Sequence, residues 1–198
     1  TPLKIEDKEW MAPLLRKGHR GALEYNFTSN FIWREVYKLQ AARFEDRLVV
    51  MSNADNPSFI FPSGEGPVEP VVRAIDEYVS ARGQQLVFNT LLNEDRAKLE
   101  AAFPGKFLIE PDRNDFDYVY DAQRLITLSG KKLASKRNHI NKFLMENSDW
   151  SYEPITKENI GDVHKMSLEW CLMAGCRENE DLFDESCAVE QAFKHFFS

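Results

Sequence analysis

The chain of 198 residues contains no apolar run that approaches the roughly 20 residues of a membrane-spanning helix. Its first residues are polar and charged, so they do not form a signal peptide. We therefore expect a cytoplasmic protein with no transmembrane segment.

Cysteine is also scarce, with only Cys171, Cys176 and Cys187 in the chain. An odd number of cysteines, all late in the sequence, favours reduced thiols over a disulfide framework. The cysteines and the neighbouring His164 and His195 lack the paired spacing of zinc ligands, so we expect no metal site. The chain contains no glycine-rich nucleotide loop, no serine nucleophile elbow and no His-Glu-x-x-His motif. These absences leave P-loop nucleotide binding, serine hydrolysis and zinc proteolysis without support.

The composition, with 43% hydrophobic and 12% aromatic residues, is typical of an ordinary soluble globular protein. Apolar periodicity and turn residues predict helices at residues 10–15, 28–36, 67–83, 94–103, 123–128, 130–145, 156–170 and 182–197. The same signals predict strands at residues 38–44, 47–51, 58–61, 85–89, 106–110, 117–121 and 150–154. Thr28 is the expected cap of the second helix, and residues 45–46 form the expected hairpin turn. Hairpin strands interleaved with helices predict an α/β fold, or an α+β fold with a mixed sheet.

Residues 129–143 form a positive segment in a chain whose net charge is −7. The segment contains five basic residues, and no Asp or Glu lies between the first and the last of them: Lys131, Lys132, Lys136, Arg137 and Lys142. Helical periodicity places Leu133, Ile140 and Leu144 on one apolar stripe, which we expect to be buried. Lys136 and Arg137 flank that stripe, so their aliphatic stems can cover it while their charged ends reach outward.

This positive segment supports two interpretations. One is a binding site for phosphate or another polyanion, because the lysines lie close to the free N–H groups and the positive dipole end at the start of a helix. Lys131 and Lys132 would be its first contacts. The other interpretation is a solvated, lysine-rich helix face, which is what most charge runs are.

Four stretches together resemble the C-terminal domain family of phosphatidylglycerol lysyltransferase. They are residues 27–34, 112–120, 128–132 and 135–143, and the last of them, Ser-Lys-Arg-Asn-His-Ile-Asn-Lys-Phe, is the most specific. The resemblance begins at about residue 20 and implies two GNAT-like (acyl-CoA N-acyltransferase-like) domains in tandem, as in Fem-type aminoacyltransferases. The first domain would occupy residues 1–128. Residues 129–198 would be the first part of the second domain, whose C-terminal half would be missing from this chain.

The resemblance implies transfer of an aminoacyl group from aminoacyl-tRNA to an amine or hydroxyl acceptor. The tRNA 3′ end would be held by an anion-binding set, namely Lys131, Lys132, Lys136, Arg137 and Asn138. His139 is the expected base and Asp117 the expected catalytic carboxylate, although Asp112 and Asp115 compete for that role and all three also suit turns. Tyr118 and Tyr120 would either stack on a base or belong to the core. We expect the Arg137 guanidinium to meet a carboxylate of residues 112–121 in a groove between the two domains.

Two further hypotheses stay open. The first is an acyl-CoA-dependent N-acyltransferase, although the chain lacks the Arg/Gln-x-x-Gly-x-Gly/Ala pattern that holds the CoA pyrophosphate. The second is a non-catalytic binding module that keeps the fold and the anion site. In every case we expect no permanently bound cofactor, with aminoacyl-tRNA or acyl-CoA acting as a co-substrate.

Overall fold

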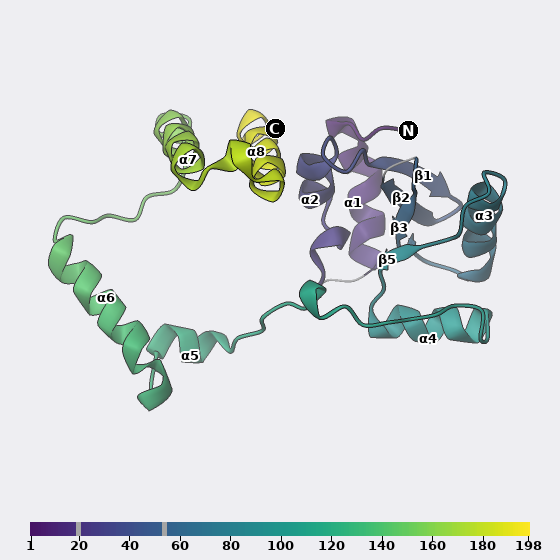
Figure 1. Ribbon diagram of the computed structural model, residues 1–198, viewed down its shortest axis with the longest axis horizontal. Helices are drawn as coiled ribbons and strands as arrows, with labels where there is room; N and C mark the ends of the chain where they lie inside the picture. Colours follow the sequence, from purple (N-terminus) through teal and green to yellow (C-terminus); the bar gives the residue numbers. More distant parts are fainter. Residues whose placement is uncertain (19–20, 53–54) are drawn as a thin grey trace. The chain divides into compact units, whose positions relative to one another are not determined.

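The computed structural model describes residues 1–18, 21–52 and 55–198. Contacts within the chain divide it into two compact units. The first unit combines Thr1–Ile109 with Gly161–Ser198, and the second unit is Glu110–Ile160. Figure 1 shows the elements of both units along the chain. The expected domain boundary at residue 128 lies inside the second unit, and the division into two GNAT-like domains stays a prediction.

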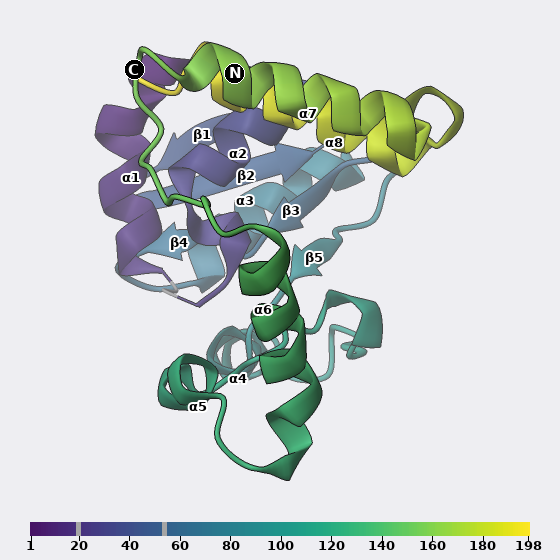
Figure 2. The ribbon, with the colours of Figure 1, turned by 90° about the vertical axis from the view of Figure 1, so that its left-hand side faces the viewer.

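A mixed five-stranded sheet is the centre of the first unit (Figure 2). Its strands are β1 (Gln40–Phe44), β2 (Arg47–Ser52), β3 (Ser58–Ile60), β4 (Ser63–Gly64) and β5 (Phe88–Thr90). The order is β1-β2-β3-β5, and β4 also pairs with β2. All pairs are antiparallel except β3 with β5, which are parallel. The expected hairpin is confirmed: Phe44 pairs with Arg47 across a turn in which Glu45 has a φ of 51°.

Helices cover both faces of this sheet, as Figures 1 and 2 show. The helices of the first unit that precede residue 110 are η1 (Ile5–Asp7), α1 (Lys8–Lys17), η2 (Leu23–Tyr25), α2 (Phe27–Trp33), α3 (Glu69–Ser80) and α4 (Asn93–Ala102). Asn26, and not Thr28, caps α2, because its Oδ1 accepts the Thr28 N–H at 2.8 Å. The i, i+3 and i+4 spacing of Val72, Ile75 and Val79 gives α3 its buried face.

The alternation of side chains along β2 separates two cores. Leu48 and Val50 face the core built with α1 and α2. Val49 and Met51 face the core built with α3 and α4. The sheet therefore lies between two helical layers, which confirms a mixed α/β fold.

One buried arginine lies at the start of β2. Arg47 is only 7% exposed, and burial lowers the pKa of its guanidinium, a shift that the nearby Asp95 carboxylate opposes. The guanidinium donates hydrogen bonds to three backbone carbonyls, those of Pro62 (2.9 Å), Gly66 and Pro67 (3.1 Å). The neighbouring Tyr25 hydroxyl donates to the Phe61 carbonyl at 3.2 Å, and burial, reinforced by the charge of Asp95, raises the pKa of Tyr25. These polar groups fix the segment that leads from the sheet into α3.

The last part of the chain returns to the first unit as three helices: α7 (Ile160–Ala174), η5 (Cys176–Glu178) and α8 (Glu180–Lys194). Helix α8 packs on α2. Arg34 Nη2 donates to Gln191 Oε1 at 2.8 Å, and the rings of Phe31 and His195 meet edge to face with centroids 4.8 Å apart. Across the described residues, no helix combines the length and apolar character needed to cross a bilayer.

The expectation of three reduced cysteines is wrong, because Cys171 and Cys176 form a disulfide. The two cysteines come together because the chain turns sharply just after α7. Gly175 adopts a left-handed conformation with a φ of 72°, and this turn leaves the two Cα atoms 5.3 Å apart. Cys187, in α8, is the free cysteine.

The second unit contains helices and irregular segments: η3 (Arg113–Asp115), α5 (Ala122–Thr127), η4 (Lys131–Leu133) and α6 (Ala134–Glu146). The strands expected at residues 117–121 and 150–154 are absent, and so is the strand at 106–110 that would precede this unit. A strand needs a neighbour for its backbone hydrogen bonds, and these segments have none among the described residues.

The expected burial of the apolar stripe of α6 is also wrong. Ile140 is 48% exposed and Leu144 is 42% exposed, while Leu133 is half-buried in the 3-10 turn before the helix. No residue of the second unit whose side chain is described is buried. The helix is therefore present, but no layer of its own unit covers its apolar face.

Candidate anion-binding site

The basic helix begins at a sharply turned loop. Leu128 closes α5 in the left-handed conformation, with a φ of 47°, and Gly130 follows with a φ of 87°. Positive φ values are rare for leucine and ordinary for glycine, so the loop is bent at two nearby positions. The bend brings the chain directly into the turn that carries Lys131 and Lys132.

The side chains of Lys131, Lys132 and Lys136 are exposed, and within the described residues none of them forms an ion pair. Lys142 is the exception, because its Nζ lies 3.7 Å from Glu146 Oε1. Unpaired and exposed lysines leave their charge available to a ligand, although salt screens it.

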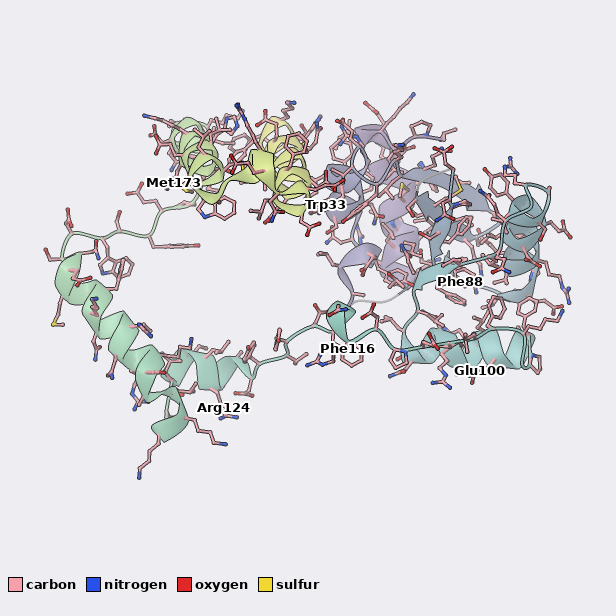
Figure 3. The ribbon with its side chains drawn as sticks, viewed as in Figure 1. Trp33, Phe88, Glu100, Phe116, Arg124 and Met173 are labelled. Carbon is pink, nitrogen blue, oxygen red and sulfur yellow. A yellow bond between two sulfur atoms is a disulfide. The ribbon has the colours of Figure 1, made fainter. Side chains whose placement is uncertain are left out.

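Arg124 is a sixth basic residue that the sequence analysis overlooked (Figure 3). It lies exposed in α5, one short loop before the lysines. The signal was in the sequence, because no acidic residue occurs anywhere from residue 122 to residue 145. The positive segment is therefore longer than residues 129–143.

Arg137 does not lie where we expected it. Its Nη1 donates to the carbonyl of Gly130 at 3.0 Å and to the carbonyl of Leu128. In the described part of the chain no carboxylate of residues 112–121 forms an ion pair with it. The expected carboxylate partner is wrong, because the loop carbonyls at the end of α5 lie within closer reach of the guanidinium.

The proposed catalytic pair is not joined. His139 and Asp117 are both exposed, and no hydrogen bond links them among the described residues. Of the competing carboxylates, Asp112 serves a turn, because its Oδ1 accepts the Asn114 N–H at 2.9 Å. The side chain of Asp115 lies outside the described residues. Asn138 lies exposed on α6 beside His139.

Tyr118 and Tyr120 form an exposed aromatic pair. Their ring centroids are 6.5 Å apart, with an angle of 20° between the planes. They are 79% and 65% exposed, so the interpretation of these rings as core is wrong. Exposed and parallel rings are available for stacking.

A cavity of about 360 Å³ lies elsewhere, in the first unit between α7 and α8. His164 Nε2 and Glu190 Oε2 are 2.6 Å apart at its edge, and Lys194 Nζ lies 3.8 Å from Glu190 Oε1. None of the predicted site residues lines this cavity. Within the described ranges, no group of three His, Cys, Asp or Glu side chains is arranged to hold a metal ion.

The fold and the site together define a mixed α/β protein with an exposed basic helix. The chain belongs to the family described as phosphatidylglycerol lysyltransferase, C-terminal, whose model matches residues 16–196. This confirms the resemblance seen in the sequence, and at the level of the family it supports an aminoacyltransferase-like role.

A solved structure shares the architecture. It is described as the crystal structure of a conserved protein of unknown function from Bacteroides thetaiotaomicron VPI-5482. The two chains are 29% identical with a TM-score of 0.89, and the match covers 99% of this chain and 67% of that chain. No curated protein matches this chain.

Proposed function

We propose that this chain is part of an aminoacyltransferase that moves an aminoacyl group from aminoacyl-tRNA to an amine or hydroxyl acceptor. The observation that carries the proposal is the set of unpaired, exposed lysines inside the region that the family model matches: Lys131, Lys132 and Lys136. The 3′ end of tRNA is a single strand of phosphates, and lysines that neutralise such a backbone release its counterions. Stacking of a terminal base on the Tyr118–Tyr120 pair would add affinity without adding charge.

The chemistry assigned to the site is attack on an ester carbonyl. In the proposal, the His139 imidazole takes a proton from the acceptor as its nitrogen or oxygen bonds to the carbonyl carbon. The proton then passes to the tRNA ribose oxygen as the ester bond breaks. A neighbouring lysine would stabilise the oxyanion that develops. Asp117 would orient the base once substrate brings the two side chains together.

The GNAT-like fold and the boundary at residue 128 are part of the same proposal. Support comes from an antiparallel meander that ends in a parallel strand, β5, with helices on both faces. The cytoplasmic location is also proposed, because charged tRNA is found there. The Cys171–Cys176 disulfide is the observation that opposes this location.

A non-catalytic anion-binding module is the second candidate. It is favoured by one observation, the separation of His139 and Asp117, which are both exposed and are not hydrogen-bonded to each other among the described residues. An acyl-CoA donor remains the third hypothesis, and a competition experiment with CoA addresses it.

The binding test is a salt titration of the affinity for charged tRNA. Lys131→Ala/Lys132→Ala should weaken binding and make the slope of log K against log salt shallower by roughly 0.7 for each lost phosphate contact. The matched control is Lys8→Ala/Lys106→Ala, which removes the same charge from exposed lysines of the first unit. If both double variants change the affinity and the salt slope equally, the positive segment is only a solvated surface and not a binding site. Displacement of tRNA by CoA would favour the acyl-CoA donor.

The catalytic test is single-turnover transfer from charged tRNA to a panel of amines and alcohols. His139→Gln should slow transfer by roughly 100-fold or more, the scale of a lost general base, while tRNA affinity stays unchanged. Binding without transfer to any acceptor would favour the non-catalytic module.

A further inference from the structure

Arg137 is bonded to the loop that precedes its own helix. Its Nη1 reaches the carbonyls of Leu128 and Gly130, the two residues on either side of Ser129. Leu128 is the C-cap residue that follows α5, and its N–H donates to the Arg124 carbonyl at 2.9 Å. The guanidinium therefore lies at the carboxyl end of α5, where a positive charge is favourable to the helix dipole.

Beyond the bond from the Leu128 N–H to α5, the other hydrogen bonds of this loop are long, and the Thr127 hydroxyl donates to Ser129 Oγ at 3.5 Å. Leu128 and Gly130 both have positive φ values, and Ser129 between them is exposed. One backbone bond closes the following turn, from the Leu133 N–H to the Gly130 carbonyl at 3.4 Å, and this length makes it weak. Two charge-assisted hydrogen bonds from one planar group are therefore the main restraint on the bend.

Lys131 and Lys132 follow directly after the restrained carbonyl. Their Cα positions are fixed by the direction in which the chain leaves Gly130. We propose that Arg137 is a positioning residue: it holds the 128–130 loop and so presents the two lysines, and it does not itself contact the phosphate. This inference rests on the proposed function for its ligand, but the restraint on the loop is independent of any ligand.

Arg137→Gln and Lys132→Gln remove the same charge and separate the two roles. Arg137→Gln should speed hydrogen exchange at the amides of Leu128 and Leu133 by roughly tenfold, the scale of one lost charge-assisted hydrogen bond. Lys132→Gln should leave both amides unchanged. Arg137→Lys should fall between Arg137→Gln and the unaltered chain, because an ammonium keeps the charge and can donate to a carbonyl, but its shorter side chain does not place a donor where Nη1 lies.

Titration with charged tRNA at several salt concentrations completes the experiment. Lys132→Gln should lower the salt slope by about 0.7, the loss of one phosphate contact. Arg137→Gln should weaken binding severalfold and keep the slope of the unaltered chain. A slope lowered as in Lys132→Gln, with unchanged amide exchange, would make Arg137 a direct phosphate ligand and overturn the proposal.

The two proposals fail in different ways. If the unaltered chain does not bind tRNA, the proposed function fails, and the exchange rates alone decide whether Arg137 holds the loop. If the chain binds tRNA but Arg137→Gln changes neither exchange nor affinity, the positioning role is refuted while the proposed function stands.

Discussion

Replacing Arg47 with methionine should lower the free energy of unfolding of the first unit by about 3–5 kcal/mol, the usual cost of removing one partner from a buried charged network. The guanidinium holds three carbonyls, with distances of 2.9 Å to Pro62 and 3.1 Å to Pro67 and a third bond to Gly66. A hydrogen bond to a charged group contributes about 1.5–3 kcal/mol net, but the three bonds share one guanidinium and do not add fully, and methionine replaces only the apolar stem. The substitution also removes the Arg47 charge that attracts the buried Asp95, which then keeps its ion pair with Lys98 at 3.1 Å.

Urea unfolding followed by far-UV circular dichroism measures this change, and a thermal scan should show the melting temperature lowered by about 6–20 °C for a chain of this length. The matched control is Arg43→Met on the neighbouring strand. The Arg43 side chain is 57% exposed and pairs with Asp46 at 3.1 Å, so its loss should change stability by no more than about 0.5 kcal/mol. Equal effects of Arg43→Met and Arg47→Met would refute the assignment of Arg47 as the residue that fixes the 62–67 segment.

Three further predictions concern the first unit. Burial raises the pKa of Tyr25, so its contribution to stability is complete below the unfolded pKa of about 10 and is lost as the pH rises above that value. The free energy of unfolding in urea should therefore fall less steeply between about pH 8 and about pH 11 for Tyr25→Phe than for the unaltered chain, and parallel curves would contradict this. Glu45→Gly should stabilise the hairpin by roughly 0.5–1 kcal/mol, because the φ of 51° at this turn position strains a residue with a Cβ, and a lower urea midpoint would contradict that reason. A double-mutant cycle of Arg34→Ala with Gln191→Ala should give a coupling energy of about 0.5–1.5 kcal/mol, whereas additive effects would mean that their 2.8 Å hydrogen bond does not hold α8 on α2.

The sequence predicts the first unit well because its signals are local. The repeat of valine and isoleucine in α3 and the alternation in β2 each match one periodicity, and a buried face follows from each. The strands expected at 106–110, 117–121 and 150–154 fail for a physical reason. Their apolar and aromatic residues suit a strand, but a strand also needs a partner strand. The sequence of one segment does not reveal whether another segment will pair with it. Leu108, Val119 and Tyr152 are therefore exposed.

The sequence predicts the charged residues of the candidate site but does not predict which groups they contact. Lys131 and Lys132 are exposed as a polyanion site requires, since charge and helical position can be read from the chain. The partner of Arg137 could not be read, because it depends on two backbone carbonyls brought close by a bent loop. The Cys171–Cys176 bond was missed for a similar reason, since the left-handed turn at Gly175 decides it and the cysteine count does not.

The contact between α2 and α8 joins residues that are far apart in the chain. Arg34 and Gln191 are separated by 157 residues, with the whole second unit between them. During synthesis at roughly 5–20 residues per second, α8 leaves the ribosome about 8–30 s after α2. Throughout that interval the ring of Phe31 lacks its His195 neighbour, and an apolar surface faces water on a half-made chain. A contact this distant also carries a loop-closure cost, so we expect α8 to dock after the rest of the first unit has formed.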